Sequence, residues 1–490
     1  MTVLGIDVGT GGTRAVVVDE EGHVVASATE AHAPFASPQA GWAEQDPGDW
    51  WRACALAVRT ALEHAGAQPS AIGLSGQMHG AVVLDEHDEI LRPSLIWCDQ
   101  RTDAECRTIV ELVGEAHLIE LTANPALTAF TLPKLLWIRR HEPEAWRRVR
   151  TVLLPKDYVR LRLTGEQATD VADASGTLMF DVANRRWSTA MLEALEIDER
   201  VLARVYESPE VSGRVSAAGA AATGLAEGTP VVAGAGDQAA GAVGMGVVRP
   251  GAVSATIGSS GVVFAATDRP QRDPRGRVHT FCHAIPDRWH VMGVTQAAGL
   301  SLRWFADTFD DGVPSYERLS ADAAAAPPGA DGVLWAPYLL GERTPHLDPD
   351  ARAALIGLTA HHTRAHVIRA ILEGVAFSLR DTLTIFDEME VPVHALRLGG
   401  GGARSTLWRQ VQADVYGREV EVLEAEEGAA FGAALLAGVG TGVWPSVDAA
   451  CEATVRVAGR VAPDAQAAAA LEARYAVFRG LYGVLKSAAG

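Results

Sequence analysis

The sequence predicts an α/β protein of two lobes, built on a duplicated plan with a central cleft. Its 490 residues exceed what one ordinary hydrophobic core supports, so two domains are expected. A pattern of strand, small-residue turn and strand begins at Val3, within residues 3–29, and occurs again at 251–270. The two copies are separated by many more residues than the period of a repeat array. We therefore predict lobes at 1–247 and 248–490.

The first half opens as an antiparallel meander. "VLGIDVG", "TGG" and "TRAVVVDEEGHVVASAT" give strand, turn, strand and a further turn at Glu21–Gly22, unlike the strand-loop-helix of a dinucleotide fold. A helix follows in "DPGDWWRACALAVRTALEHAG". Asp46 is its expected N-cap, Pro47 fits its first turn, and Gly66 is its expected stop.

The second half alternates long helices with glycine-rich turns. The helix from His366 to Met389 carries Ile368, Ile371 and Leu372 on one face at helical spacing. An apolar strand then enters "RLGGGGARS". Three further helices are predicted, at 407–416, at 426–440 in an Ala/Gly-rich segment, and at 464–488.

Composition excludes several classes of protein. The formal net charge of −19, with arginines spread along the chain, opposes binding to nucleic acid and to anionic membranes. The five cysteines form no C-x-x-C pair, so neither a disulfide framework nor a zinc site is indicated. No leader-like start and no apolar run of about 18 residues is found, so we expect a cytoplasmic protein.

In three segments, small residues adjoin groups that could bind phosphate, a metal ion or a flat ring. In "GIDVGTGGTR", Asp7 ends a strand, and the glycines after it offer backbone N–H groups to phosphate oxygens while the carboxylate holds hydrated Mg²⁺. The alternative is a plain hairpin turn with Asp7 as turn former. "TIGSSG" at 256–261 mirrors this loop, and "RLGGGGARS" leaves room for a flat ring against the backbone.

Asp237 is the one charge in "GAGDQAAGAVG". A general base must come within hydrogen-bond reach of a substrate hydroxyl, and small neighbours leave that approach clear. The alternative is that Asp237 caps a helix beginning at Gln238. The residues alone support both interpretations equally.

These segments, in order along the chain, resemble the FGGY family of carbohydrate kinases. "SGQMHG" at 75–80 is similar to the family's sugar loop, and "FTLPKLLW" at 130–137 and "GLTAHHTRAHVIRAILEG" at 357–374 are similar to its two signatures. "PYLLGERTPHLDP" and "GGGARSTLWRQVQAD" extend the match nearly end to end.

The resemblance implies an actin-like ATPase fold, made of duplicated ribonuclease H-like domains, and phosphorylation of a ketopentose such as D-xylulose by ATP with Mg²⁺. It implies that Asp237 is the general base and that Asp7 holds the metal, through water. It places the sugar against Met78, His79, Asp237 and Gln238. The residues implied for nucleotide and phosphate contacts are Thr10, Gly11, Thr13, Arg14, Gly258, Ser259, Gly400, Gly401 and Ser405.

Some positions depart from the family pattern. Ser259 replaces a threonine of the second phosphate loop but keeps a hydroxyl, and Cys98 and Gln100 replace Asn and Gly, which leaves the sugar open. Asp99 and Arg101 either shape the same pocket or form an exposed ion pair. The alternatives are a kinase for another ketose or polyol such as ribulose, and an actin-superfamily nucleotide switch or filament protein. A homodimer is a candidate assembly.

Overall fold

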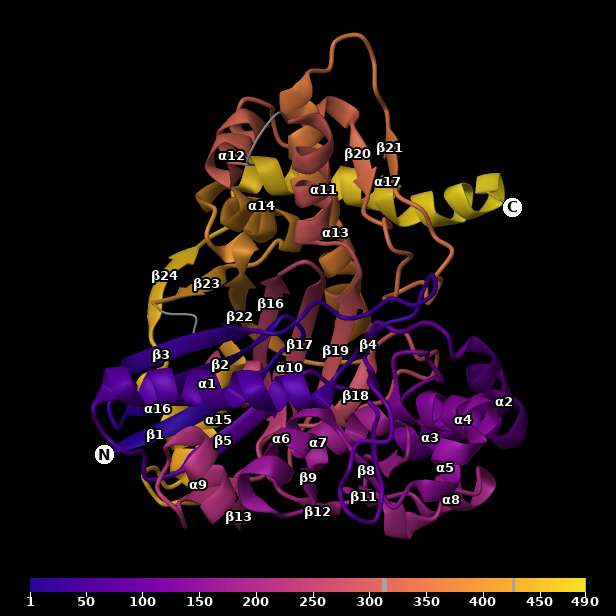
Figure 1. Ribbon diagram of the computed structural model, residues 1–490. Helices are drawn as coiled ribbons and strands as arrows, with labels where there is room; N and C mark the ends of the chain where they lie inside the picture. The colour runs from indigo at the N-terminus through magenta and orange to yellow at the C-terminus, as the bar shows by residue number, and fades with distance from the viewer. Residues whose placement is uncertain (311–314, 425–427, 490) are drawn as a thin grey trace.

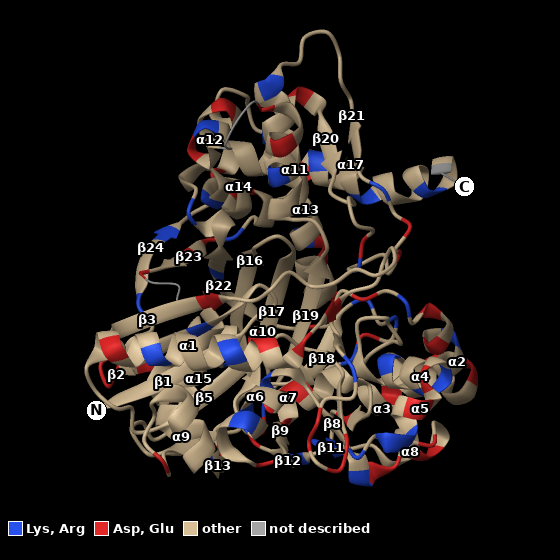
Figure 2. Cartoon of the chain, viewed as in Figure 1, with Lys and Arg blue, Asp and Glu red and all other residues tan. Residues whose placement is uncertain are grey.

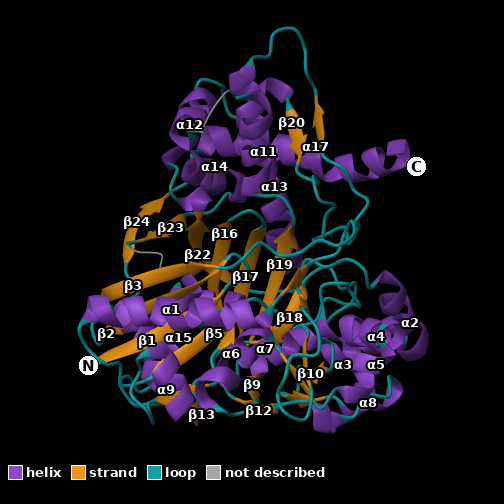
Figure 3. Cartoon of the chain, viewed as in Figure 1, coloured by secondary structure: helices purple, strands orange, loops and turns teal. Residues whose placement is uncertain are grey.

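Two twisted sheets, each flanked by helices, form the framework of the molecule in a computed structural model that describes residues 1–310, 315–424 and 428–489 (Figures 1 and 3). The strands of the first sheet, in spatial order, are β13 (Val211–Arg214), β14 (Pro230–Val232), β5 (Ile72–Gly76), β1 (Thr2–Val8), β2 (Gly12–Asp19) and β3 (Val24–Ala31), with β15 (Ala235–Gly236) also on β5. Those of the second are β18 (His279–Cys282), β19 (Trp289–Thr295), β17 (Gly261–Thr267), β16 (Gly251–Ile257), β22 (Val393–Gly400), β23 (Val420–Leu423) and β24 (Val457–Val461).

The two sheets share one plan, which confirms the predicted duplication. The hairpin β1–β2 is antiparallel, and β1 is parallel to β5 on its other side. The hairpin β16–β17 is likewise antiparallel, and β16 is parallel to β22. In both sheets the turn of the hairpin therefore lies beside the carboxyl end of a parallel strand, the edge where α/β proteins bind ligands.

The predicted helix over "DPGDWW" is α1 (Pro47–Ala65). The Asp46 carboxylate caps it by accepting the N–H of Gly48 at 2.8 Å, and Gly66 ends it with a left-handed φ of 64°. The remaining helices of the first half are α2 (Asp103–Val113), α3 (Glu115–Thr122), α4 (Thr131–His141), α5 (Pro143–Arg148), α6 (Pro155–Thr164), α7 (Val171–Ala174), α8 (Thr189–Ala194), α9 (Ala217–Thr223) and α10 (Asp237–Gly244).

In the second half, α13 (Arg364–Glu388) buries the predicted face with Ile368, Ile371 and Leu372. The other helices are α11 (Gly299–Phe309), α12 (Tyr316–Ala324), α14 (Thr406–Tyr416), α15 (Gly428–Gly440), α16 (Val447–Thr454) and α17 (Ala465–Ala489). Short two-stranded sheets pair β4 (Glu44–Gln45) with β7 (Ser94–Leu95), β6 (Val82–Leu84) with β8 (Thr151–Leu153), β9 (Ala168–Asp170) with β12 (Arg204–Tyr206), β10 (Phe180–Asp181) with β11 (Arg186–Trp187), and β20 (Leu334–Ala336) with β21 (Ala354–Ile356).

Helix α15 belongs to the second half of the sequence but packs against the first sheet and α10. Its small residues permit a very close approach: a Cβ added at Gly5 of β1 would lie 1.8 Å from the carbonyl oxygen of Ala430, and one at Gly73 of β5 would lie 1.9 Å from that of Ala433. The predicted boundary at 247/248 stays a prediction, and α15 crosses it. The sequence predicted a closely packed Ala/Gly-rich helix, and the structure shows that its neighbours are the first sheet and α10.

Fully buried charges lie near the carboxyl end of β5, where an added Cβ on Gly76 would lie 3.0 Å from the Cβ of Lys156. Lys156 Nζ lies 2.6 Å from carboxylate oxygens of both Asp157 and Asp170, and 3.1 Å from Asp173. Arg160 also pairs with Asp157, at 2.6 Å. Elsewhere Lys, Arg, Asp and Glu are spread over the elements of both halves (Figure 2). Among the described helices, none combines the length and the apolar character that a membrane span requires.

Candidate active site

Residues predicted for the sugar and for the metal lie where three neighbouring parallel strands end. Asp7 in β1 and Ala235 in β15 both lie opposite Ser75 of β5 in register. The chain therefore leaves β1 after Asp7, β5 at Gly76 and β15 at Gly236 on the same edge of the sheet. Asp7, Met78 and Asp237 are thereby brought to one place from positions far apart in the sequence.

Asp7 is a half-buried carboxylate with one firm partner. Its Oδ1 accepts the hydroxyl proton of Ser75 at 3.0 Å. Burial raises its pKa above the ordinary value, while the Ser75 hydrogen bond and the charge of Arg14, opposite it in the β1–β2 register, lower it. An added cation at this carboxylate would relieve the cost of its burial.

Asp237 is the first residue of α10, and Gly236 occupies the capping position, so the interpretation of Asp237 as the cap is not supported. The side chain is half-buried, and the Gln238 amide donates to its Oδ1 over a long 3.4 Å. Burial, and then the negative charge of Asp7, raises the pKa of Asp237 to about 7. A carboxylate with this pKa is basic enough to accept a proton from an alcohol during its attack.

Met78 and His79 extend this edge. Met78 is buried and packs beside Gly236, where an added Cβ would lie 2.7 Å from its Cγ. The ring of His79 lies 4.9 Å from that of Phe130, edge to face. His79 Nδ1 lies 2.7 Å from the carbonyl oxygen of Gly176, so this nitrogen carries the proton and donates. Burial lowers the pKa of His79 to about 3, which keeps the ring neutral and leaves Nε2 as an acceptor for a hydroxyl.

The β1–β2 turn is open at its tip and closed at its base. Gly11 is exposed, and nothing lies within 4 Å of where a Cβ would be. The Thr10 hydroxyl accepts the indole N–H of Trp97 at 2.9 Å and donates to Gln77 at 3.3 Å. The Thr13 hydroxyl is buried against His32 Nε2 at 2.9 Å. The backbone of the tip can therefore face a phosphate, whereas the side chain of Thr13 points into the interior and does not fit the predicted phosphate path.

The corresponding edge of the second sheet borders a cavity of about 820 Å³, within the usual range for small-molecule sites. Gly258 and Ser259, from the β16–β17 turn, line one side, and Gly401 and Ser405, which follow β22, line another. Gly400 pairs with Ile257 in register and supports this wall from behind. Gly258, Ser259, Gly401 and Ser405, predicted from separate motifs to hold the nucleotide, thus share one cavity.

Sequence reasoning missed several walls of this cavity. Arg404 had no predicted role but lines it, as do Leu302 and Arg303 from α11 and Tyr316 and Ser320 around α12. The Ser320 hydroxyl lies 3.0 Å from that of Ser405, which also caps α14 by accepting the N–H of Trp408 at 3.2 Å. Only "TIGSSG" and the Gly-rich segment carried a signal of the cavity, and the contribution of α12 depends on tertiary packing.

Asp99 and Arg101 are buried rather than exposed. Their ion pair is 2.7 Å long, Arg101 also reaches Glu44 at 2.8 Å, and its guanidinium lies 3.6 Å from the centre of the Trp42 ring. The exposed-pair alternative is therefore wrong. Both charges are already satisfied, so they brace the wall that carries Cys98, which is half-buried.

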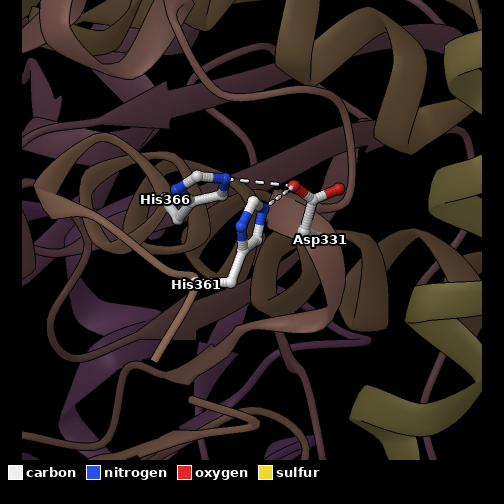
Figure 4. A group of neighbouring side chains, drawn as sticks. All are labelled: Asp331, His361 and His366. Atoms are coloured by element: carbon white, nitrogen blue, oxygen red, sulfur yellow. Dashed lines mark hydrogen bonds and ion pairs between the residues drawn. The ribbon is translucent and has the colours of Figure 1, made fainter. Parts of the chain in front are cut away.

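Asp331, His361 and His366 form a cluster of metal-ligating groups at the start of α13 (Figure 4). His366 Nε2 lies 3.1 Å and His361 Nε2 3.5 Å from the Asp331 carboxylate. The backbone N–H of Thr363 donates to His366 Nδ1 at 3.1 Å, so the proton of the neutral ring sits on Nε2 and points at Asp331. The bond to Nδ1 is part of a capping box that closes the helix N-terminus, and it leaves the proton on Nε2, the nitrogen that a metal beside Asp331 would need.

The fold, with its two matching strand edges, defines a phosphotransferase of the actin-like ATPase type. The chain belongs to the FGGY family of carbohydrate kinases: its N-terminal domain model matches residues 2–244 and its C-terminal domain model residues 253–441.

Relatives and solved structures agree along the whole chain. The chain is 40% identical over 483 residues to the xylulose kinase of Bacillus subtilis, covering 98% of this chain and 96% of that one. It is also 40% identical over 481 residues to that of Escherichia coli, covering 98% of each. The crystal structure of xylulose kinase from Rhodospirillum rubrum superposes with a TM-score of 0.92 at 33% identity, covering 99% of both chains.

Proposed function

We propose that this chain transfers the γ-phosphoryl group of ATP to D-xylulose and forms D-xylulose 5-phosphate. The observation that carries the proposal is the position of Asp237, half-buried at the strand edge beside Met78 and Asp7, with a pKa raised to about 7. The two xylulose kinases to which the chain is similar along almost its full length support the choice of sugar.

In this mechanism the sugar lies along Met78 and His79 with its reacting hydroxyl at Asp237. Asp237 takes the hydroxyl proton as the oxygen attacks the γ-phosphorus, and the Gln238 amide steadies the carboxylate. Nε2 of the neutral His79 accepts a hydrogen bond from a sugar hydroxyl. Backbone N–H groups at Gly11 and at Gly258–Ser259 face the phosphates from the two hairpin turns, and the cavity bordered by Gly401 and Ser405 takes the adenosine.

FGGY kinases need a divalent cation, and we propose Mg²⁺. Asp7 fits this role, because its buried carboxylate has a hydroxyl on one oxygen and a second acid, Asp237, within electrostatic reach. Bound there, directly or through water, the cation would neutralise charge on the phosphates.

General-base catalysis contributes about 10²–10⁴-fold, which is too little for a kinase alone. The larger part must come from holding the hydroxyl and the γ-phosphate in line and from the donors around the phosphates. Both hairpins must therefore reach one triphosphate, so we propose that the lobes close on the substrates.

The test is Asp237→Ala, with Asp307→Ala on the exposed surface of α11 as the matched control. Asp237→Ala should abolish sugar-dependent ADP release while ATP affinity stays within about twofold. Normal turnover would remove Asp237 as the base. A panel of ketoses and polyols decides the sugar: a tenfold preference for ribulose or a polyol in kcat/KM, about 1.4 kcal/mol, would overturn xylulose.

Filament formation with ATP, or ATP hydrolysis whose rate does not depend on sugar, would instead favour a nucleotide switch.

We place the reaction in the cytoplasm, where ATP and small sugars meet. A homodimer is also proposed, and light scattering across a range of protein concentrations tests it.

A further inference from the structure

Arg343 comes from the second half of the chain, between β20 and β21, and is fixed beside the sugar edge of the first half. Its neighbour Thr344 donates its backbone N–H to the carbonyl oxygen of Val294 at 2.9 Å and accepts the N–H of Val294 at 3.0 Å. Val294 belongs to the buried apolar cluster that also contains Met78 and Phe130. The backbone at Arg343 is thereby held next to the wall of the proposed sugar site.

The adjacent acid, Glu342, acts on Arg343 through its charge, which favours the protonated guanidinium, while its oxygens are hydrogen-bonded elsewhere. Glu342 Oε1 accepts the backbone N–H groups of Gln296 at 3.0 Å and of Arg343 at 2.8 Å. Its Oε2 accepts the hydroxyls of Thr295 at 2.6 Å and Ser378 at 3.2 Å. Both oxygens are thus occupied by other donors. Among the residues that the structure describes, none forms an ion pair or hydrogen bond with the half-buried Arg343 guanidinium.

Besides Glu342, the titratable groups that the charge of Arg343 reaches include His79, Lys134 and His279. Lys134 Nζ donates to the carbonyl oxygen of Phe130 at 2.9 Å and to two neighbouring carbonyls. The Phe130 ring contacts both His79 and His279, with centroids 4.9 and 5.7 Å away. Burial is the main reason that the pKa values of His79, Lys134 and His279 are lowered, and the charge of Arg343 lowers each of them further. The charge of Arg343 therefore reaches the ring of His79, which borders the proposed sugar site.

These contacts form a sequence along the site. Asp237 stands next to Gly236, Gly236 packs on Met78, and His79 follows Met78 in the chain and lies within the field of Arg343. An open-chain sugar whose reacting hydroxyl faces Asp237 would run along Met78 and His79, and the charge of Arg343 reaches His79. A guanidinium has five N–H donors and no acceptor, so a carbonyl oxygen suits it better than a group that also donates.

We propose that Arg343 binds the carbonyl end of the open-chain ketose and sets the preference of this kinase for ketoses over polyols. The inference rests on the proposed function, because it assumes that Asp237 marks the reacting end. A half-buried cation without a partner is costly, and a bound carbonyl oxygen would supply the missing acceptor. Since Arg343 and His79 come from different halves of the chain, the sugar itself would join them.

The experiment compares Arg343→Met with Arg352→Met, a matched control on an exposed arginine in the same connecting segment. Titration calorimetry measures the affinities for D-xylulose, for xylitol, which has a hydroxyl in place of the carbonyl, and for ATP. Arg343→Met should weaken D-xylulose binding by about tenfold to a hundredfold and xylitol binding by less than about threefold, with ATP unchanged. Arg343→Lys should recover part of the loss, and Arg352→Met should match the wild type.

Equal weakening of D-xylulose and xylitol, or no change in either, would overturn the role of Arg343. If Arg343→Met does not fold, Arg343→Lys and Arg343→Gln provide the same comparison. If the wild type phosphorylates another ketose in preference to D-xylulose, the proposed substrate fails, and Arg343 is then tested on that ketose and its polyol. The two failures are therefore distinguishable.

Discussion

Asp237 and Asp7 lie near enough that the negative charge of Asp7, after the larger effect of burial, raises the pKa of Asp237 to about 7. The folded protein therefore holds a proton on Asp237 below this pH, where an ordinary carboxyl would be ionised. Only the ionised form can accept the sugar proton.

Activity should therefore fall on the acid side. We predict that kcat/KM for the sugar decreases as the pH drops through about 7, approaching tenfold per pH unit. A cation bound at Asp7 would offset the negative charge that acts on Asp237. Raising the Mg²⁺ concentration should therefore move the acid limb of the kcat/KM profile to lower pH. Steady-state rates from about pH 5 to 9 at two Mg²⁺ concentrations measure both effects. A kcat/KM that stays constant down to about pH 5 would contradict the assignment.

A second prediction concerns the contact between α15 and the first sheet. Gly73→Ala places a methyl group 1.9 Å from a backbone carbonyl oxygen of α15, so strand or helix must move. We expect a loss of about 2–3 kcal/mol in the free energy of unfolding, measured by urea denaturation. Gly241→Ala in α10 is the control, because nothing lies within 4 Å of its added Cβ, and it should gain up to about 1 kcal/mol. Similar stability of the two variants would show that the interface is loose.

A third prediction uses Gly401, where an added Cβ meets only Ile257 O, at 3.7 Å, and so fits the fold while its side chain enters the cavity. Gly401→Val should raise the KM for ATP by about tenfold or more and leave the melting temperature within a few degrees. Gly459→Val, at an exposed position in β24 with open space around it, should change neither. An unaltered KM for ATP in Gly401→Val would place the nucleotide elsewhere.

A fourth prediction concerns the buried charges behind the site. Lys156→Met leaves Asp157, Asp170 and Asp173 without their shared cation and should cost about 3–5 kcal/mol in unfolding free energy. Lys486→Met removes an exposed ion pair with Asp348 and should cost less than about 1 kcal/mol. Equal losses would mean that burial of the Lys156 cluster carries little energetic weight.

The sequence predicted the elements whose signals are local. Asp46 and Gly66 mark the ends of α1 through their own capping chemistry, and the two hairpins follow from small residues between apolar strands. The resemblance to the FGGY family implied that Asp7, Met78 and Asp237 serve one site, and the strand register brings them to one edge of the sheet.

The features that the sequence did not predict depend on contacts between residues far apart in the chain. The buried hydroxyl of Thr13 reflects its contact with His32, and nothing in the turn itself indicates which way that side chain points. Ser320 reaches the nucleotide cavity through the packing of α12 beside the start of α14. The Ala/Gly composition of α15 predicted a close neighbour but carried no information about which sheet would receive it.

The crossing of α15 has a consequence for synthesis on the ribosome. The apolar face of the first sheet is covered by residues 428–440, which emerge only when most of the polypeptide has been translated. The first sheet therefore stays partly uncovered throughout translation, and neither half of the gene alone would encode a finished domain.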